Sequence, residues 1–311
     1  MIHSLSFDIE EHFQVAAFDC PARRRHWEVL QSRVEKSTDI ILALLDSANV
    51  KATMFILGWV AERHSGMVKR IANAGHEIAC HGYSHELISV QNPATFREDV
   101  RRAKKILEDI TGQAVLGYRA PTFSITKETT WALPILVEEG FLYDSSIVPA
   151  MHDSYGIPDS SPSLHSLDTS SGMLWEVPPS TCQLGWTRIP VGGGGYFRLF
   201  PYSIFRWFLT KVEREGHPLV MYFHPWELDP EQPKMNGSLL SKFRHYVNLQ
   251  KTQKRMTWLL QDFRFSPIRE TLPSFSYSLD PHSSSGQRHE EVESFASLPS
   301  HSDSANSYTP K

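Results

Sequence analysis

Two histidines and a group of acidic residues have the types and spacing that best fit catalysis in this chain of 311 residues. His81 and His85 are four residues apart, and if the chain turns helically after Cys80, both imidazoles lie on one face. In that position they can bind a single metal ion. A histidine pair supplies only two ligands, so at least one more must come from elsewhere in the chain.

The first expected strand is the best source of that ligand, because it runs from apolar residues into three acids, Asp8, Glu10 and Glu11. Alternate residues of a strand share a face, so Asp8 and Glu10 point together while Glu11 points away. Two histidines and one carboxylate, with a spare carboxylate beside them, are the minimum residue set of a metal-dependent hydrolase.

Composition limits the classes of protein that fit. The length and a hydrophobic content of 41% suit one large α/β domain or two small ones. A net charge of −4 shows no basic bias, so we expect no nucleic-acid partner. Three scattered cysteines without a C-x-x-C pair argue against a disulfide framework. No signal-peptide pattern and no long apolar run occur, so we expect a cytoplasmic chain without an integral membrane segment.

The elements that position these residues alternate along the chain. Strands are expected at 4–11, 52–56, 75–80, 115–118, 141–144, 174–177 and 219–223. Helices are expected from residue 37, then at 60–74, 92–112, 126–139, 201–215 and 239–261. About seven strands, each ending at a polar motif, predict an α/β fold with a mostly parallel sheet that is closed or nearly closed. Its site should lie at the carboxyl edge of the strands.

Three segments fall outside this alternation. Residues 149–173 are rich in Pro, Ser, Asp and Gly, which predicts a long surface loop. The glycine run 192–195 lacks the features of a phosphate loop, so it indicates a close backbone approach or a mobile loop. From residue 269 to 311 the chain is Ser-rich and poor in aliphatics, so we expect a folded domain over 1–268 followed by a disordered tail.

Four strand ends together resemble the polysaccharide deacetylases, the NodB-homology or carbohydrate esterase family 4 group, over roughly residues 1–265. The segment from His81 to His85 resembles the family's H-[ST]-x-x-H motif, with Gly82 in place of Ser or Thr. Arg119-Ala-Pro is similar to its R-x-P motif, and His224 stands where its late L-x-H motif lies. The resemblance implies a deformed (β/α) barrel and metal-dependent removal of acetyl groups from N-acetylated sugars.

The opening motif departs from the family pattern. The usual T-F-D-D is replaced by Ser-Phe-Asp followed by Ile-Glu-Glu, so the second acid is displaced by one or two positions. Strand geometry favours Glu10 as the ligand, and a bulge would bring in Glu11 instead. Four longer strings, at 8–15, 143–147, 192–198 and 224–230, resemble the deacetylase subfamily found beside exosortase/PEP-CTERM exopolysaccharide loci.

The resemblance implies a role for each motif. The expected metal ligands are Glu10, His81 and His85, and the expected catalytic residues are Asp8 as general base, His224 as general acid and Arg119, which would hold Asp8 charged and oriented. By family analogy the N–H of Thr122 contributes to the oxyanion hole. Asp144 is a candidate to orient His224 or Arg119. Trp186, Tyr196 and Trp226 are candidates to stack on sugar rings, or else to lie in the core.

The expected function is removal of N-acetyl groups from a polysaccharide that contains N-acetylhexosamine, or from its precursor, in exopolysaccharide biosynthesis. The expected cofactor is one divalent ion, zinc first, with cobalt, nickel or iron as alternatives. Two other functions stay open: hydrolysis of small amides on the same scaffold, and glycan binding without catalysis. The sequence does not indicate an oligomeric state.

Overall fold

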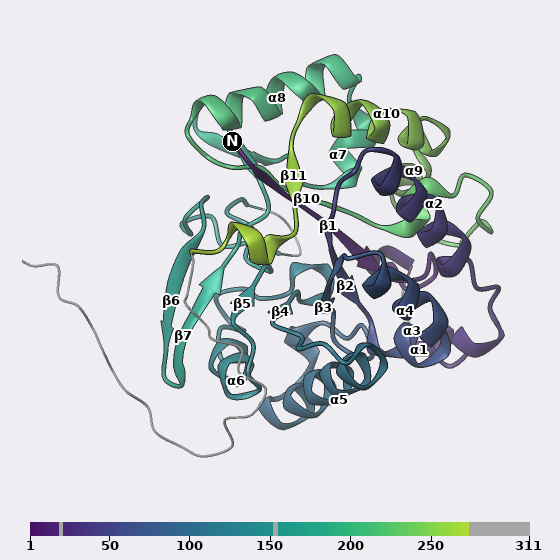
Figure 1. Cartoon of the computed structure of the whole chain (residues 1–311), viewed down its shortest axis with the longest axis vertical. Helices are drawn as coiled ribbons and strands as arrows, with labels where there is room; N and C mark the ends of the chain where they lie inside the picture. Colours follow the sequence, from purple (N-terminus) through teal and green to yellow (C-terminus); the bar gives the residue numbers. More distant parts are fainter. Residues whose placement is uncertain (19–20, 152–154, 274–311) are drawn as a thin grey trace, which may run out of the picture. The chain divides into compact units, whose positions relative to one another are not determined.

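Seven parallel strands form the main sheet of the computed structural model, which describes residues 1–18, 21–151 and 155–273. In spatial order they are β10 (Val220–Phe223), β1 (His3–Ile9), β2 (Thr53–Ile56), β3 (Glu77–Cys80), β4 (Gly117–Tyr118), β5 (Tyr143–Asp144) and β7 (Gly172–Glu176). Two further strands join this sheet: β11 (Phe265–Ser266) pairs parallel with β1, and β6 (His165–Thr169) pairs antiparallel with β7. β1 therefore lies deep within the sheet (Figure 1).

The gap between β7 and β10 is bridged by the chain that follows β7. Ser180 N–H donates to the carbonyl of Val220 at 3.1 Å, and Tyr222 N–H donates to the carbonyl of Gly192 at 2.8 Å. The hydroxyl of Ser180 also accepts from Val220 N–H at 2.7 Å. These few bonds replace a regular ladder, so the sheet curves into a deformed barrel. The expected fold and its approximate strand count are confirmed.

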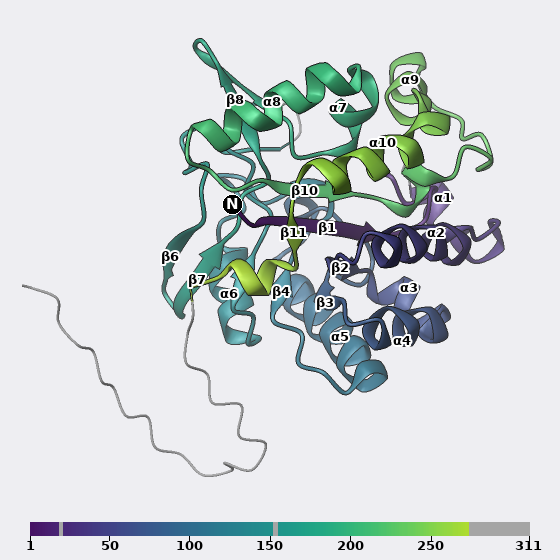
Figure 2. The ribbon, with the colours of Figure 1, turned by 45° about the horizontal axis from the view of Figure 1, so that its top comes forward.

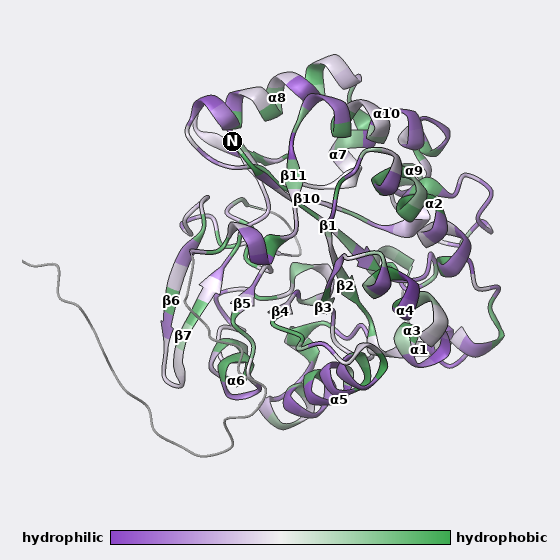
Figure 3. Cartoon of the chain, viewed as in Figure 1, coloured by the Kyte–Doolittle hydropathy of each residue, from purple (hydrophilic) through white to green (hydrophobic). Residues whose placement is uncertain are grey.

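Helices cover the outer face of the sheet, and their apolar stripes face inward (Figures 1 and 3). The clearest is α5 (Pro93–Thr111), whose buried side chains Phe96, Val100, Ala103 and Leu107 follow helical spacing. The side chain of Asn92 caps its first turn, and Gly112 ends it in the left-handed conformation, as expected from the sequence. The other helices are α1 (Pro21–Arg24), α2 (Val34–Ser47), α3 (Gly58–Arg63), α4 (Ser65–Asn73), α6 (Ala132–Glu138), α7 (Gly194–Leu199), α8 (Tyr202–Arg214), α9 (Leu239–Tyr246) and α10 (Leu249–Asp262).

Short 3-10 turns and one hairpin complete the folded part. The turns are η1 (Ala16–Phe18), η2 (Trp27–Val29), η3 (Ile88–Val90), η4 (Pro121–Phe123), η5 (Pro225–Leu228) and η6 (Ile268–Thr271). The hairpin consists of β8 (Thr181–Leu184) and β9 (Thr187–Pro190). No helix within the described residues is long and apolar enough to cross a bilayer.

The helix expected at 60–74 is two helices, α3 and α4, which meet at His64. Three further elements differ from the sequence expectation for local reasons. The helix expected at 126–139 begins only at Ala132, because Thr129 bonds the backbone of the preceding turn instead. The helix expected at 239–261 is two helices, α9 and α10, separated at Asn248, which is left-handed and donates to the carbonyl of Arg198. The loop expected at 149–173 contains β6.

A small apolar cluster fills the barrel interior, and η6 packs against it at the amino ends of β2 and β3. The cluster comprises Phe55, Ala79, Tyr143, Val177, Val220 and Ile268. Ile268 N–H donates to Thr53 and Arg269 N–H donates to the buried carboxylate of Glu77. The first compact unit therefore runs to Leu272, a few residues beyond the expected boundary at 268. The rest of the expected tail, 274–311, lies outside the described residues.

Candidate active site

Asp8 stands at the carboxyl end of β1, where the alternation of the strand directs it into the barrel. Leu5, Phe7 and Ile9 belong to the core between sheet and helices. Ser6 and Asp8 take the opposite face, and both contact the buried guanidinium of Arg119. The next two acids follow the end of the strand, and their carboxylates take different positions.

Glu10 lies with the two histidines. Its Oε2 atom is 2.8 Å from His85 Nε2 and 4.0 Å from His81 Nε2. One ligand atom from each of the three residues lies within 4.8 Å of the others, and all three side chains are buried. The carbonyl of Arg119 is 2.8 Å from His81 Nδ1, which leaves Nε2 of that ring turned toward Glu10. Two imidazoles and one carboxylate therefore converge.

Glu11 points away, as the strand period predicts. Its carboxylate accepts hydrogen bonds from the Ser32 hydroxyl and, at 3.0 Å, from Arg33 N–H, at the beginning of α2. These bonds satisfy backbone and side-chain donors at the start of that helix. Of the two candidate acids, the geometry brings Glu10 to the histidines.

The histidines converge by a different route from the one we expected. Residues 81–85 form an irregular loop rather than a helical turn, with left-handed backbone at Gly82 (φ 74°) and His85 (φ 53°). Asp99 of α5 holds this loop by accepting from both N–H groups at 83–84. A Cβ at Gly82 would lie 2.9 Å from an oxygen of Asp99, which explains why glycine replaces the Ser or Thr of the family motif.

The charges in the cluster suit a metal ligand set. Burial would raise the pKa of Glu10, but the neighbouring His85, His224 and His81 lower it to about 2, so the carboxylate is charged at neutral pH. Burial lowers the pKa of His81 to about 4, so this imidazole is neutral and its lone pair is available.

Arg119 fixes Asp8. Its Nη1 donates to Asp8 Oδ1 at 2.7 Å and to the Ser6 hydroxyl at 2.8 Å, while Nε and Nη2 donate to Ser145. Its guanidinium carbon lies 4.1 Å from the centre of the Phe55 ring. One carboxylate oxygen of Asp8 is thus held, and the other lies 3.8 Å from His224 Nε2.

His224 is held by an acid that the sequence reasoning did not single out. Its Nδ1 lies 2.8 Å from Glu227, whose second oxygen accepts from Arg198 at 2.7 Å. Burial would lower the pKa of His224, but the bond to Glu227 and the charge of Glu10 raise it to about 9. Nε2 faces Asp8 and Glu10. Arg198 and Glu227 lie in the strings 192–198 and 224–230, which resemble a deacetylase subfamily. That resemblance was the sequence signal that could have identified them.

The glycine run lies against this arrangement, so the expected close backbone approach is confirmed. A Cβ at Gly193 would lie 2.3 Å from the Tyr222 hydroxyl, and one at Gly194 would lie 1.9 Å from an oxygen of Glu227. Gly195 has no atom within 4 Å of the corresponding position.

Gly194→Ala should therefore displace Glu227 and loosen His224. We expect the free energy of unfolding to fall by about 1–3 kcal/mol and catalysis to fall by about ten- to hundredfold. The matched variant Gly195→Ala should stabilise α7 by about 0.5–1 kcal/mol. Chemical denaturation and turnover of both variants test this, and equal behaviour of the two would contradict the close contact.

Four expected substrate-contacting residues have different outcomes. Thr122 lines the same cavity as Asp8, Glu10 and the histidines, and its backbone is left-handed (φ 55°), the kind of strain often found at functional sites. Trp226 also lines it, but its ring is buried and stacks on both His224 and His245, so it does not offer a free face to a sugar. Its indole N–H instead donates to Glu10 at 3.1 Å.

Tyr196 and Asp144 lie elsewhere. Tyr196 lines a separate groove between α7 and α9. The carboxylate of Asp144 accepts from the hydroxyl and N–H of Ser146, and burial raises its pKa to about 6. The Ser146 oxygen accepts in turn from Ala120 N–H at 2.8 Å, so Asp144 is linked to the loop after Arg119 through Ser146. An orienting role of Asp144 toward His224 or Arg119 stays a prediction.

Sequence reasoning missed several residues that complete the cavity wall. They are Val15, Ala16, Ala17, Phe123, Tyr155 and Tyr222. A signal existed for Tyr222, because it is two residues before His224 and therefore shares its face of β10. Tyr155 lies in the segment expected as a loop, which carries no periodic signal.

This arrangement is typical of metal-dependent hydrolases: a buried site of two histidines and one carboxylate beside a separately held acid and a histidine. Residues 24–135 match the model of the family described as polysaccharide deacetylase, and residues 145–273 match a domain of unknown function (DUF3473). Residues 24–135 therefore belong to a domain of the polysaccharide deacetylase type, the family that the sequence motifs resemble.

Curated relatives agree with this family. A peptidoglycan deacetylase-like protein of Gibberella zeae is 34% identical over 156 residues, which are 48% of this chain and 44% of the relative. The peptidoglycan deacetylase of Helicobacter pylori is 35% identical over 37% of each chain. The peptidoglycan-N-acetylglucosamine deacetylase of Bacillus cereus is 40% identical over 30% of this chain and 35% of the relative. The matches thus span less than half of each relative.

Solved structures share the fold over most of the chain. A Mycobacterium smegmatis protein assigned as a polysaccharide deacetylase superposes with a TM-score of 0.60 at 22% identity, over 86% of this chain and 87% of that one. Puue allantoinase superposes with a TM-score of 0.53 at 16% identity, over 85% of both chains. At these identities the likeness concerns the fold alone.

Proposed function

We propose that this chain is a metal-dependent N-deacetylase that acts on a polysaccharide containing N-acetylhexosamine, or on its precursor. The observation that carries the proposal is that one cavity is lined by Glu10, His81 and His85 together with two independently held groups, Asp8 and His224. A site that only binds glycans would need neither a proton acceptor nor a proton donor beside the three candidate metal ligands. The names of the relatives support the choice of an N-acetylated glycan.

The three clustered residues fit a divalent ion. They supply two imidazole nitrogens and one carboxylate oxygen, the three-ligand set that catalytic zinc sites use, and they are buried with the second nitrogen of His81 already oriented by a carbonyl. We propose zinc first, with cobalt, nickel or iron as alternatives. When bound, such an ion supplies Lewis-acid activation of a water molecule and of the acetyl carbonyl.

The residues of the chain would divide the proton transfers. The free oxygen of Asp8 accepts a proton from the attacking water, while Arg119 keeps the other oxygen in place. The N–H of Thr122 donates to the developing oxyanion. Nε2 of His224, with Nδ1 fixed by Glu227, protonates the departing nitrogen. Water and the acetamido group thereby become acetate and a free amine.

Exopolysaccharide biosynthesis is the biological process we propose. Its support is the resemblance of four strings of this chain to deacetylases found at exopolysaccharide loci. Two of those strings, at 192–198 and 224–230, contain Arg198, His224 and Glu227, which form one connected set of contacts in the site.

Acetate release tests the function. We expect the metal-loaded protein to release acetate from chitooligosaccharides or from an acetylated exopolysaccharide, and to lose this activity when a chelator removes the ion. Hydrolysis of small linear or cyclic amides with no release from either glycan would assign an amide hydrolase instead. Glycan binding without acetate release, at full metal loading, would leave the chain a binding protein.

A further inference from the structure

The helices α7 to α10 differ in charge from the rest of the chain. Residues 194–212 and 233–261, which form most of them, contain nine Lys or Arg and no Asp or Glu, although the whole chain has a net charge of −4. The helix ends beyond these ranges add one cation, Arg214, and two acids, Glu213 and Asp262. The nine are Arg198, Arg206, Lys211, Lys234, Lys242, Arg244, Lys251, Lys254 and Arg255. Arg198 and Arg255 are buried, so seven cations remain for the outer surface, of which Arg206 pairs with Asp262 and Lys211 with Glu215.

The same segments hold half of the large apolar side chains that are exposed in the described part of the chain. Seven of fourteen lie here: Leu199, Ile204, Trp207, Leu239, Leu240, Phe243 and Trp258. Leu239 is 87% exposed, Leu240 57% and Trp207 52%. Isolated exposed apolar residues are ordinary, but a concentration of them together with cations is not.

These side chains belong to one layer of the molecule. α7 packs against α8, α9 and α10, and the four helices lie together along one side (Figures 1 and 2). On α10, Lys251, Lys254 and Trp258 recur at helical spacing, and the Lys254 ammonium lies 5.1 Å from the Trp258 ring. On α8, Arg206 and Trp207 face the same groove as Trp258.

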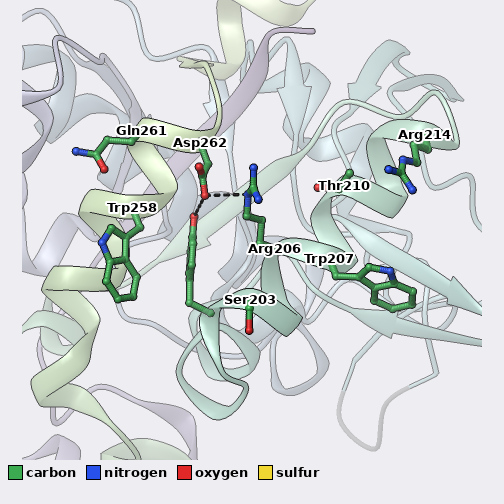
Figure 4. Close-up of a pocket in the computed structure, with 9 residues that line it drawn as sticks. Ser203, Arg206, Trp207, Thr210, Arg214, Trp258, Gln261 and Asp262 are labelled. Atoms are coloured by element: carbon green, nitrogen blue, oxygen red, sulfur yellow. Dashed lines mark hydrogen bonds and ion pairs between the residues drawn. The ribbon is translucent and has the colours of Figure 1, made fainter.

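The groove between α8 and α10 shows what kind of ligand suits this layer. Trp258 and Trp207 are on its two walls, with Asp262 and Arg206 between them (Figure 4). The carboxylate of Asp262 already accepts from Tyr202 at 2.7 Å and pairs with Arg206 at 3.0 Å. The only acid in the groove is therefore engaged within the protein. Exposed aromatic and aliphatic side chains beside lysine and arginine suit a lipid interface better than they suit a sugar.

We propose that the α7–α10 layer docks on an anionic lipid bilayer. Its cations complement the negative charge of acidic phospholipid headgroups, and Leu239, Leu240 and the two indoles enter the interface between headgroups and acyl chains. The layer adjoins the site, because Arg198 of α7 donates to Glu227 at 2.7 Å, and Glu227 holds His224 of the catalytic cavity. Docking would bring the cavity to substrates held at the bilayer surface.

Vesicle sedimentation of the full chain tests this without any turnover. Vesicles of phosphatidylcholine with about 30% phosphatidylglycerol should retain the protein, pure phosphatidylcholine should not, and salt should release it. The double variant Lys251→Glu/Lys254→Glu should bind at least about tenfold more weakly. Leu239→Ser/Leu240→Ser should weaken binding while the salt dependence stays.

Matched controls carry the same substitutions elsewhere. Lys69→Glu/Lys105→Glu and Val29→Ser/Val90→Ser change exposed residues outside the layer and should bind as the wild type does. The proposal would be overturned if the protein bound both vesicle types equally, or if the control variants lost as much binding. It would also be overturned if the protein bound chitooligosaccharides through Trp207 and Trp258 but did not bind vesicles. All four variants should release acetate from soluble chitooligosaccharides at the wild-type rate, so a failure of docking is distinct from a failure of the deacetylase assignment.

Discussion

Asp8→Asn should lower the rate of acetate release by about a hundredfold to ten-thousandfold, the usual contribution of a general base, while the metal content stays close to that of the wild type. Asn keeps the shape of the side chain and an oxygen that can accept from Arg119, but it cannot take a proton at neutral pH. Asp8 also lies outside the cluster of Glu10, His81 and His85, so its loss leaves the ligand set complete.

Elemental analysis and single-turnover rates on the same preparation check this result. Ser6→Ala is the matched control, because it removes a neutral partner of Arg119 at 2.8 Å and leaves the carboxylate in place. That variant should retain activity within about tenfold, since it loses two hydrogen bonds of about 1 kcal/mol each, one from Arg119 and one to the Met221 carbonyl, and leaves the bond from Arg119 to Asp8 in place. If Asp8→Asn lost the metal instead, Asp8 would be assigned as a metal ligand and Glu10 as the general base.

Glu10→Ala should lose the metal and, with it, at least about a thousandfold in acetate release, because the ion supplies several kcal/mol of transition-state stabilisation. His85→Ala should behave in the same way. Glu11→Ala is the matched variant one position along the chain. It should keep about one ion per chain, as expected for a single three-ligand site, and lose about 1–2 kcal/mol of stability, because the start of α2 loses its acceptor.

Metal content after dialysis, followed by thermal unfolding of the three variants, separates these effects. A wild-type metal content in Glu10→Ala, together with loss in Glu11→Ala, would show that the loop after β1 rearranges when the ion binds. A full metal content in all three variants would move the ion to a different set of ligands and remove the basis of the proposed reaction.

The sequence indicated much of this site because its chemistry lies at strand ends. Periodicity of two placed Asp8 and Glu10 together and turned Glu11 away, and parallel strands bring their carboxyl ends to one edge. The two histidines do lie beside Glu10, but the helical turn expected between them is absent, since Gly82 and His85 are left-handed. Gly82 and its contact with Asp99 decide that loop, and Asp99 lies on a helix that local pattern cannot relate to it.

Contacts between distant segments were beyond the reach of the sequence. The sequence around Trp226 does not show that its ring stacks on two histidines rather than on a sugar. The bond from Arg198 to Glu227 joins residues 29 positions apart, and the close approach of Gly194 to Glu227 depends on the same packing. The strand β6 also escaped prediction, because its burial alternates only between intermediate and exposed.

The order of strands in the sheet has a consequence for biosynthesis. β1 pairs with β2 on one side and with β10 on the other, so Ser6 contacts both Thr53 and Tyr222 in register. A ribosome releases the clustered acid and histidines long before His224. Until β10 emerges, β1 is an open edge of the sheet in the nascent chain. The three candidate metal ligands also lack the proposed proton donor, His224. The proposed activity would therefore begin only when nearly the whole folded unit has been made, and a chain truncated before residue 219 should be inert and prone to aggregate.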